Sequence, residues 1–136
     1  QYEISNFALP GFESRHNLKY WRCEEYLGLG PAAHSFLDGR RFYYPRDLAG
    51  FLRGDPPVAD GPGGDFDEFA MLALRLTEGL REGSCRARFG YPIPEAMRRR
   101  AAPLERAGYC RLSPEGIALT RTGFLVSNAV IGELLA

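Results

Sequence analysis

A stretch rich in proline and glycine, G-D-P-P-V-A-D-G-P-G-G-D at residues 54–65, divides the chain into two parts. Proline lacks a backbone N–H and fixes φ, and glycine is costly inside a helix or strand, so this density of the two residues disfavours regular structure. We therefore predict a linker over residues 54–64. One unit, residues 1–53, precedes it, and a second unit, residues 65–136, follows it.

The first unit is predicted to contain short strands. Q-Y-E-I-S-N-F-A at residues 1–8 alternates β-forming and polar residues, and residues 25–37 and 40–44 are two further candidate strands. Residues 12–22 show no clear helical period, so no long helix is expected to join these strands. Two or three strands without covering helices cannot bury both faces of a sheet. We therefore expect the end of a larger sheet, and a chain that is a C-terminal fragment.

The second unit is predicted to begin with a helix. Asp65 with Glu68 three residues later forms the capping-box pattern of a helix start. The apolar residues that follow share one helix face: Phe69, Leu72, Ala73, Leu76 and Leu80. This helix is expected to end at residues 82–83, and a short second helix is expected over residues 84–89.

The end of the chain combines helices with a hairpin. Pro94 suits the first turn of a helix that Pro103 should kink or split. Y-C-R-L and I-A-L-T flank the turn S-P-E-G at residues 113–116, which is typical of a β-hairpin. Thr120 can cap a last helix, which is apolar nearly all round and is expected to be buried. Residues 65–136 therefore predict a small α-rich, winged-helix-like domain with a β-hairpin.

Charge and composition argue against several classes of partner. The chain carries 17 basic and 17 acidic residues, and its net charge of zero gives no long-range attraction for nucleic acid. The one basic run, Arg98–Arg100, is interpreted as a solvated helix face. No apolar run approaches the roughly 20 residues of a membrane span, and no signal segment opens the chain, so we predict a cytoplasmic protein without an integral membrane segment. The cysteines are widely spaced and are expected to be reduced thiols: Cys23, Cys85 and Cys110.

The only two histidines, His16 and His34, both lie in the first unit, and His16 opens the run H-N-L-K-Y-W. A neutral imidazole can donate one nitrogen to haem iron while a hydrogen bond holds the other nitrogen. Asn17 can supply that hydrogen bond, and Tyr20 and Trp21 can supply a flat apolar wall. The residues alone nevertheless favour an ordinary hydrogen-bonded histidine near the surface.

A second candidate ligand site is G-L-G-P-A-A-H-S at residues 28–35. Gly28 and Gly30 allow the backbone to approach a flat or anionic ligand closely. The run lacks the G-x-G-x-x-G spacing of nucleotide-binding loops, because Ala33 occupies the last place. Crowding between strands explains the small residues equally well, so ligand lining and packing both stay open.

Several of these motifs together resemble a known family. Y-E-I-S-N-F-A-L-P-G-F-E-S-R-H-N-L-K-Y-W, followed by Y-L-G-L-G-P-A-A-H-S, resembles the late part of the HemW-type radical-SAM proteins. These are haem chaperones of the oxygen-independent coproporphyrinogen III oxidase-like family. E-F-A-M-L-A-L-R-L-T-E-G-L and L-T-R-T-G-F-L-V-S-N-A-V-I resemble the C-terminal domain that HemW shares with the oxidase HemN. The resemblance covers essentially the whole chain, and H-N-x-x-Y-W is its most specific motif.

The resemblance implies a fold and a set of cofactors. Residues 1–53 are then the last strands of a partial (β/α) radical-SAM barrel, and residues 65–136 are the C-terminal domain. The family binds S-adenosylmethionine and a 4Fe–4S cluster, which is held by a C-x-x-x-C-x-x-C loop. The chain contains no such loop, so both cofactors belong to the full-length parent and the chain by itself cannot perform radical chemistry.

The resemblance also implies roles for the candidate residues. His16 is then the haem ligand through its imidazole, with Asn17, Tyr20 and Trp21 as supports. The candidates for lining S-adenosylmethionine are Gly28, Gly30 and His34, although Pro31 and Ala32 stand where relatives often have another glycine.

The expected function is therefore haem binding and delivery to haem-requiring proteins, with this chain as the C-terminal portion of a HemW-like protein. An oxygen-independent coproporphyrinogen III dehydrogenase of porphyrin biosynthesis is the enzymatic alternative. A packing module that no ligand touches is the third possibility that the residues leave open.

Overall fold

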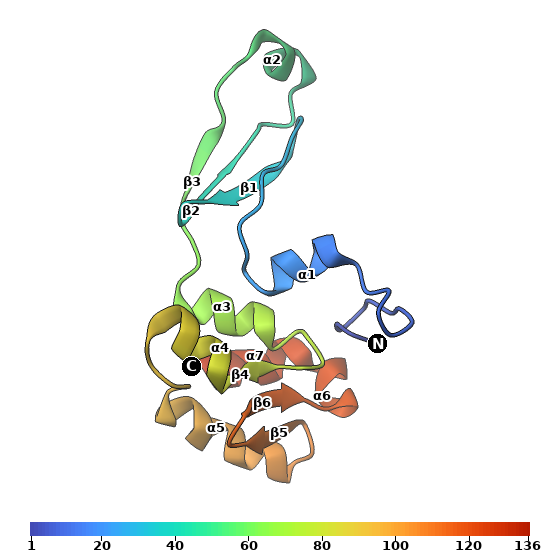
Figure 1. The fold of residues 1–136 in the computed structure, drawn as a ribbon, viewed down its shortest axis with the longest axis vertical. Helices are drawn as coiled ribbons and strands as arrows, with labels where there is room; N and C mark the ends of the chain where they lie inside the picture. The colour runs from blue at the N-terminus through green and yellow to red at the C-terminus, as the bar shows by residue number, and fades with distance from the viewer.

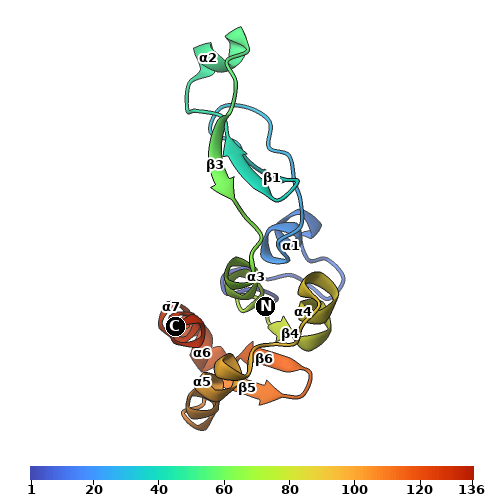
Figure 2. The same cartoon turned by 90° about the vertical axis from the view of Figure 1, so that its left-hand side faces the viewer.

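A computed structural model describes residues 1–136 as seven helices and six strands. Their bounds in chain order are α1 (Arg15–Trp21), β1 (His34–Leu37), β2 (Arg40–Tyr43), α2 (Leu48–Arg53), β3 (Val58–Pro62), α3 (Phe66–Ala73), β4 (Leu80–Arg81), α4 (Glu82–Phe89), α5 (Glu95–Arg106), β5 (Cys110–Ser113), β6 (Gly116–Leu119), α6 (Arg121–Leu125) and α7 (Ser127–Leu135). Strands β1–β3 and α2 form an arm at one end, and α3–α7 with the second sheet form a body at the other end (Figures 1 and 2). Helix α1 lies at the junction of arm and body.

The arm is a three-stranded antiparallel sheet in the order β1-β2-β3. His34 pairs with Tyr43 in the β1–β2 hairpin, whose turn places Asp38 and Gly39 at positive φ. Positive φ at both central residues is the geometry of a type I′ turn, whose twist matches the right-handed twist of the hairpin strands. The prediction of a barrel end is not confirmed, because these strands form a small antiparallel sheet of their own.

Strand β3 lies inside the proline- and glycine-rich stretch. It is an edge strand that pairs with β2 only. Ala59 of β3, for example, lies opposite Phe42 of β2. An edge strand tolerates proline because one side of its backbone needs no ladder hydrogen bonds. The prediction that residues 54–64 lack regular structure is therefore wrong for Val58–Pro62.

The N-terminal segment differs from its prediction in two ways. Residues 1–8 form no strand, and Glu3 alone makes an isolated bridge to Leu76. Residues 12–22 contain helix α1, for which no period was evident. The side chain of Ser14 accepts a hydrogen bond from the Asn17 N–H at 3.3 Å and so caps the first turn. A local cap, rather than an apolar face, therefore defines this helix.

Helix α3 begins as predicted but ends early. The Asp65 side chain accepts a hydrogen bond from the Glu68 N–H at 2.9 Å, which confirms the N-cap. The helix ends at Ala73, not at residues 82–83, and Leu80 lies in strand β4 instead of on the helix face. Gly79 has a φ of 69°, and a side chain there would lie 2.2 Å from the Ile117 carbonyl oxygen. The chain turns at this glycine so that β4 can join the second sheet.

The body has one apolar core between its helices and the sheet β4-β6-β5. The fully buried residues of that core include Leu74, Leu80, Ile117, Leu119 and Leu134. The β5–β6 hairpin over S-P-E-G is confirmed. Helix α4 covers the short helix expected over residues 84–89. Helix α5 runs through Pro103 without interruption, so the expected split is wrong.

The last helix is divided at Val126. Thr120 caps α6 as predicted, since its Oγ1 accepts a hydrogen bond from the Gly123 N–H at 3.0 Å. Leu125 is 86% exposed and Val126 is 44% exposed, so the expected burial of this segment is wrong at these two residues, although Val130, Ile131 and Leu134 are buried. A winged-helix arrangement is not confirmed by this sheet and its helices. None of the seven helices has the length and hydropathy that a bilayer crossing requires.

Candidate functional site

His16 lies exposed on α1, and its partner is Tyr20. The Tyr20 hydroxyl is 2.6 Å from Nε2 of His16, and the two rings meet edge to face with centroids 4.9 Å apart. The i, i+4 spacing on a helix brings these two side chains to one face. Nδ1 of His16 has no hydrogen-bond partner. Tyr20, not Asn17, therefore holds the second imidazole nitrogen.

Tyr20 connects this pair to the arm. Its ring packs edge to face on Tyr26, with centroids 4.5 Å apart. The backbone of Tyr26 bridges Phe36 in β1 through two hydrogen bonds of 2.8 and 3.0 Å. The orientation of Tyr20, and through it the imidazole ring of His16, is thus set by a contact with the arm.

Asn17 and Trp21 contact other parts of the molecule. Asn17 donates from Nδ2 to Oδ1 of Asn6 at 3.4 Å. The Trp21 ring lies beneath the guanidinium of Arg75, 4.6 Å from ring centroid to carbon, and its Nε1 is buried without a partner. Residues five apart on a helix point about 140° apart, so Trp21 and His16 lie on different faces of α1. The structure brings together His16 and Tyr20 but not the four motif residues.

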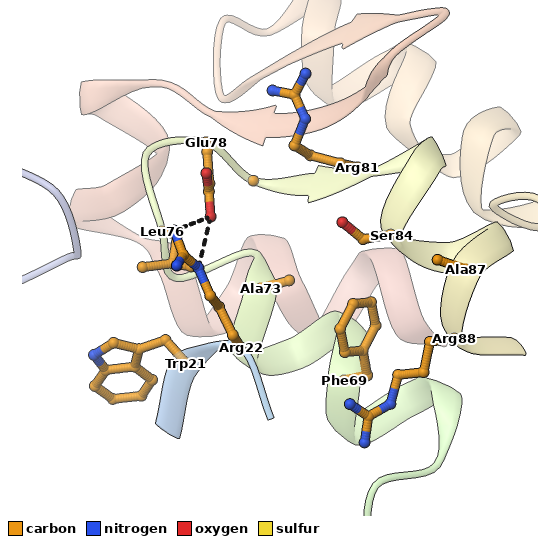
Figure 3. A pocket seen from close by; sticks show the side chains of 11 residues that line it. Trp21, Arg22, Phe69, Ala73, Leu76, Glu78, Arg81, Ser84, Ala87 and Arg88 are labelled. Atoms are coloured by element: carbon orange, nitrogen blue, oxygen red, sulfur yellow. Dashed lines mark hydrogen bonds and ion pairs between the residues drawn. The ribbon is translucent and has the colours of Figure 1, made fainter. Parts of the chain in front are cut away.

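Trp21 lines a cavity of about 390 Å³ between the end of α1 and the body (Figure 3). Its apolar surface comes mainly from Phe69, Ala73, Leu76 and Ala87. Arg22 reaches from α1 to Glu78, with a shortest N···O distance of 3.3 Å, and the dashed lines in Figure 3 mark this pair. Arg88 also lines the cavity, and it donates to the Cys23 carbonyl oxygen at 2.9 Å. This cavity lies at the surface where α1 contacts the body.

The second predicted site, residues 28–35, lies at the start of β1. The Gly28 N–H donates to Oγ of Ser35 at 3.0 Å, and a side chain at Gly28 would meet the His34 carbonyl oxygen at 2.2 Å. Strand crowding therefore accounts for Gly28, and Gly30 has a φ of 107° that favours glycine. His34 is exposed and stacks on its cross-strand neighbour Tyr43, with centroids 5.2 Å apart. The structure places His34 in the arm, with no contact to the His16–Tyr20 pair.

The cysteines do not contribute a metal site. Burial is the main cause that raises the pKa of the thiols of Cys23 and Cys110, and burial raises the pKa of Cys85 to about 11. All three thiols are free and stay protonated at neutral pH. No group of three or more His, Cys, Asp or Glu residues is arranged to hold a metal ion.

Sequence reasoning missed Glu3, a carboxylate that is 0% exposed. Burial alone would raise its pKa, but hydrogen bonds from Ser5, Asn6 and Arg75 and the charge of Arg75 outweigh that effect and lower the pKa. The alternating pattern of residues 1–8 gave the one available signal, because it placed Glu3 on the opposite face from Tyr2 and Ile4. Its partner Arg75 lies 72 residues away and could not be identified from that pattern.

Comparisons with known proteins bear on the whole chain. Residues 66–126 match the family model described as the HemN C-terminal domain. The protein named heme chaperone HemW from Bacillus subtilis is 33% identical over 144 residues, which cover 99% of this chain and 38% of that protein. Heme chaperone HemW from Mycobacterium tuberculosis H37Rv is 34% identical over 140 residues, which cover 98% of this chain and 34% of that protein.

A third relative is similar over a shorter stretch. The mouse protein named radical S-adenosyl methionine domain-containing protein 1, mitochondrial, is 62% identical over 53 residues, which cover 39% of this chain and 11% of that protein. No solved structure matches the chain. The chain spans little more than a third of the two HemW proteins. These matches show that the chain belongs to the HemW and HemN family, with its HemN C-terminal domain at residues 66–126.

Proposed function

We propose that this chain is the C-terminal portion of a haem chaperone, and that His16 supplies the protein ligand to the haem iron. The observation that carries the proposal is an exposed imidazole with one free nitrogen, held at the other nitrogen by Tyr20. The relatives named heme chaperone align along nearly the whole chain, which supports the same reading. Haem is the cargo, and the recipients are haem-requiring proteins.

The residues around α1 suit haem better than a bare metal ion. The porphyrin occupies four positions on the iron, so one imidazole is enough to complete a binding site. The segment just before α1 exposes three large apolar side chains, Phe7 at 70%, Leu9 at 74% and Phe12 at 79%. These three side chains lie within six residues of the chain, and exposed apolar side chains of this size suit a flat apolar macrocycle.

The hydrogen bond to Tyr20 assigns a role to each imidazole nitrogen. Metal-binding histidines usually hold their second ring nitrogen in a hydrogen bond, which fixes the tautomer and the ring orientation. In the proposed site Nε2 donates to the Tyr20 oxygen and Nδ1 faces the iron. Asn17 and Trp21 support haem binding indirectly, because their contacts hold α1 against its surroundings.

Hemin titration of the full-length protein tests the proposal. The Soret band is followed for wild type, for His16→Ala and for His34→Ala, which removes the only other histidine of this chain. We expect His16→Ala to weaken hemin binding at least about tenfold, since the loss of even a hydrogen-bond partner of a metal ligand has an effect of that size, and His34→Ala to leave the affinity unchanged. An unchanged affinity and spectrum in His16→Ala overturns the assignment.

The division of the chain and the cofactors of the full-length parent belong to the same proposal. In this proposal residues 1–53 form the C-terminal end of the radical-SAM barrel, and residues 54–64 link it to the C-terminal domain at residues 65–136. Gly28, Gly30 and His34 then line bound S-adenosylmethionine. The name of the mouse relative includes a radical S-adenosyl methionine domain, which supports this part. Equilibrium dialysis of S-adenosylmethionine with the full-length His34→Ala variant is expected to show weaker binding than wild type.

An enzymatic function is the second candidate, because the matching family model carries the name HemN. As a coproporphyrinogen III dehydrogenase, the full-length protein would convert two propionate side chains of its substrate to vinyl groups. Anaerobic incubation of the reconstituted full-length protein with coproporphyrinogen III decides between the two functions. Vinyl products favour the enzyme, and their absence together with hemin binding favours the chaperone.

A further inference from the structure

We propose that the ion pair between Glu3 and Arg75 positions α1, and with it His16, on the C-terminal domain. The inference rests on the proposed function of His16, and it assigns to the C-terminal domain the task of holding the helix that carries the haem ligand. Neither Glu3 nor Arg75 touches His16, so both act as positioning residues.

Helix α1 depends on such contacts because it has no buried residue of its own. Most surface helices are held by an apolar face packed on a core, which α1 lacks. The pair Arg22–Glu78 joins α1 to the body, but both side chains are more than 40% exposed, and pairs of that kind contribute little. Other contacts must therefore hold α1 on the body, and two of them, at Asn17 and Trp21, lead to Glu3 and Arg75.

Glu3 is the most extensively bonded carboxylate near α1. Its Oε1 accepts from Nε and Nη2 of Arg75 at 3.1 and 2.9 Å. Its Oε2 accepts from the N–H of Ser5 at 2.9 Å, from the Ser5 hydroxyl at 3.2 Å and from Nδ2 of Asn6 at 2.7 Å. A fully buried carboxylate is tolerated only when it is paired and hydrogen-bonded, so loss of one partner disturbs the whole set.

Arg75 anchors this set in the C-terminal domain, two residues after the end of α3. The backbone confirms the attachment, since the Ile4 N–H donates to the Arg75 carbonyl oxygen at 3.1 Å and the Thr77 N–H donates to the Tyr2 carbonyl oxygen at 3.0 Å. The same guanidinium covers the Trp21 ring of α1 at 4.6 Å. One arginine therefore contacts both the N-terminal segment and the last residue of the helix.

The path from Glu3 to α1 runs through two asparagines. Asn6 donates to Glu3, and Asn17 donates to Asn6 at 3.4 Å from the position next to His16. At the other end, Arg88 donates to the carbonyl oxygen of Cys23, just after the helix. The Glu3 set is thus the contact that controls the end of α1 where His16 lies.

The experiment uses the full-length protein with two measurements, amide hydrogen exchange and hemin titration. Glu3→Gln keeps the size of its side chain, Arg75→Gln shortens its side chain, and each removes the ion pair. Both are expected to accelerate exchange in residues 15–22, to leave exchange in α5 unchanged, and to weaken hemin binding about tenfold. Arg22→Gln is the matched control, because it removes the exposed pair at the same junction, and it should change neither measurement.

A double-variant comparison identifies the route of the effect. If Glu3 acts through His16, Glu3→Gln causes no further loss of hemin affinity once His16 is replaced by Ala. Additive losses overturn the proposal, and so does unchanged exchange in residues 15–22 of Glu3→Gln. Should Glu3→Gln impair folding, Arg75→Lys replaces it, and partial recovery of α1 protection relative to Arg75→Gln is then expected.

The failure of the proposed function gives a different result. In that case His16→Ala binds hemin as wild type does, while exchange in residues 15–22 still responds to Glu3→Gln. That combination removes the role of His16 in haem binding and retains the control of α1 by Glu3.

Discussion

His16 and Tyr20 lie one helical turn apart, and the hydrogen bond between them leaves Nδ1 of the imidazole free. The residue types and their spacing were visible in the sequence, but Asn17 was the expected partner of His16. Asn17 follows His16 directly, and adjacent helix residues point in different directions, so it contacts Asn6 instead. The sequence therefore identifies the candidate site residues, and helix geometry decides which of them contact one another.

Replacement of Tyr20 by Phe tests the role of this hydrogen bond. The ring contact with Tyr26 is retained, while Nε2 of His16 loses the partner that fixes its tautomer. We expect hemin affinity to fall about tenfold, with the type of axial ligation unchanged. Soret titration measures the affinity, and an affinity equal to that of wild type shows that Tyr20 does not orient the ligand.

Among the elements, those defined by short-range contacts were predictable. The caps at Asp65 and Thr120 and the β5–β6 hairpin each depend on residues three or four apart, and all three are present. The end of α3 was not predictable from nearby residues, because it depends on the pairing of β4 with β6. That pairing joins Leu80 to Ile117, almost 40 residues later in the chain, after a turn at Gly79. Strand β3 was missed for the same reason, since its partner β2 supplies its hydrogen bonds.

Two glycines in the last helices provide a matched test of packing. A side chain at Gly123 in α6 would lie 1.9 Å from the Tyr109 carbonyl oxygen, whereas one at Gly132 in α7 would meet nothing within 4 Å. Gly123→Ala is expected to lower the free energy of unfolding by about 1–3 kcal/mol through overpacking. Gly132→Ala should raise it by about 0.5–1 kcal/mol, since alanine favours a helix. Urea unfolding measures both, and equal effects contradict the close contact at Gly123.

At the scale of the whole molecule, charged side chains join the arm to the body. Arg41 in β2 pairs with Glu68 in α3, and its guanidinium covers the Phe36 ring at 4.6 Å. Glu68 also accepts from the Gly64 N–H at 2.6 Å. The overall arrangement could not be predicted from the sequence, because such pairs join residues in separate units. The family resemblance identified the C-terminal domain correctly, but local patterns did not indicate the antiparallel arm.

Glu3 makes the stability of this arrangement depend on pH. Its pKa is lowered from 4.5 in the folded protein, so the carboxylate stabilises the fold fully above about pH 4.5, and this contribution is lost as the pH falls through the folded pKa. We expect wild type to lose more unfolding free energy between neutral pH and about pH 3 than Glu3→Gln does. Urea unfolding at the two pH values measures this, and equal losses contradict a charged Glu3 in the folded protein.

The most direct test of the central claim is the axial-ligation spectrum of ferric haem bound to the full-length protein. Magnetic circular dichroism is recorded for wild type, His16→Gly and His34→Gly, each with and without added imidazole. We predict a histidine-ligated spectrum for wild type and for His34→Gly, its loss in His16→Gly, and its recovery when imidazole fills the space left by the side chain. A His16→Gly protein that shows the wild-type spectrum without imidazole would contradict the claim that His16 binds the iron.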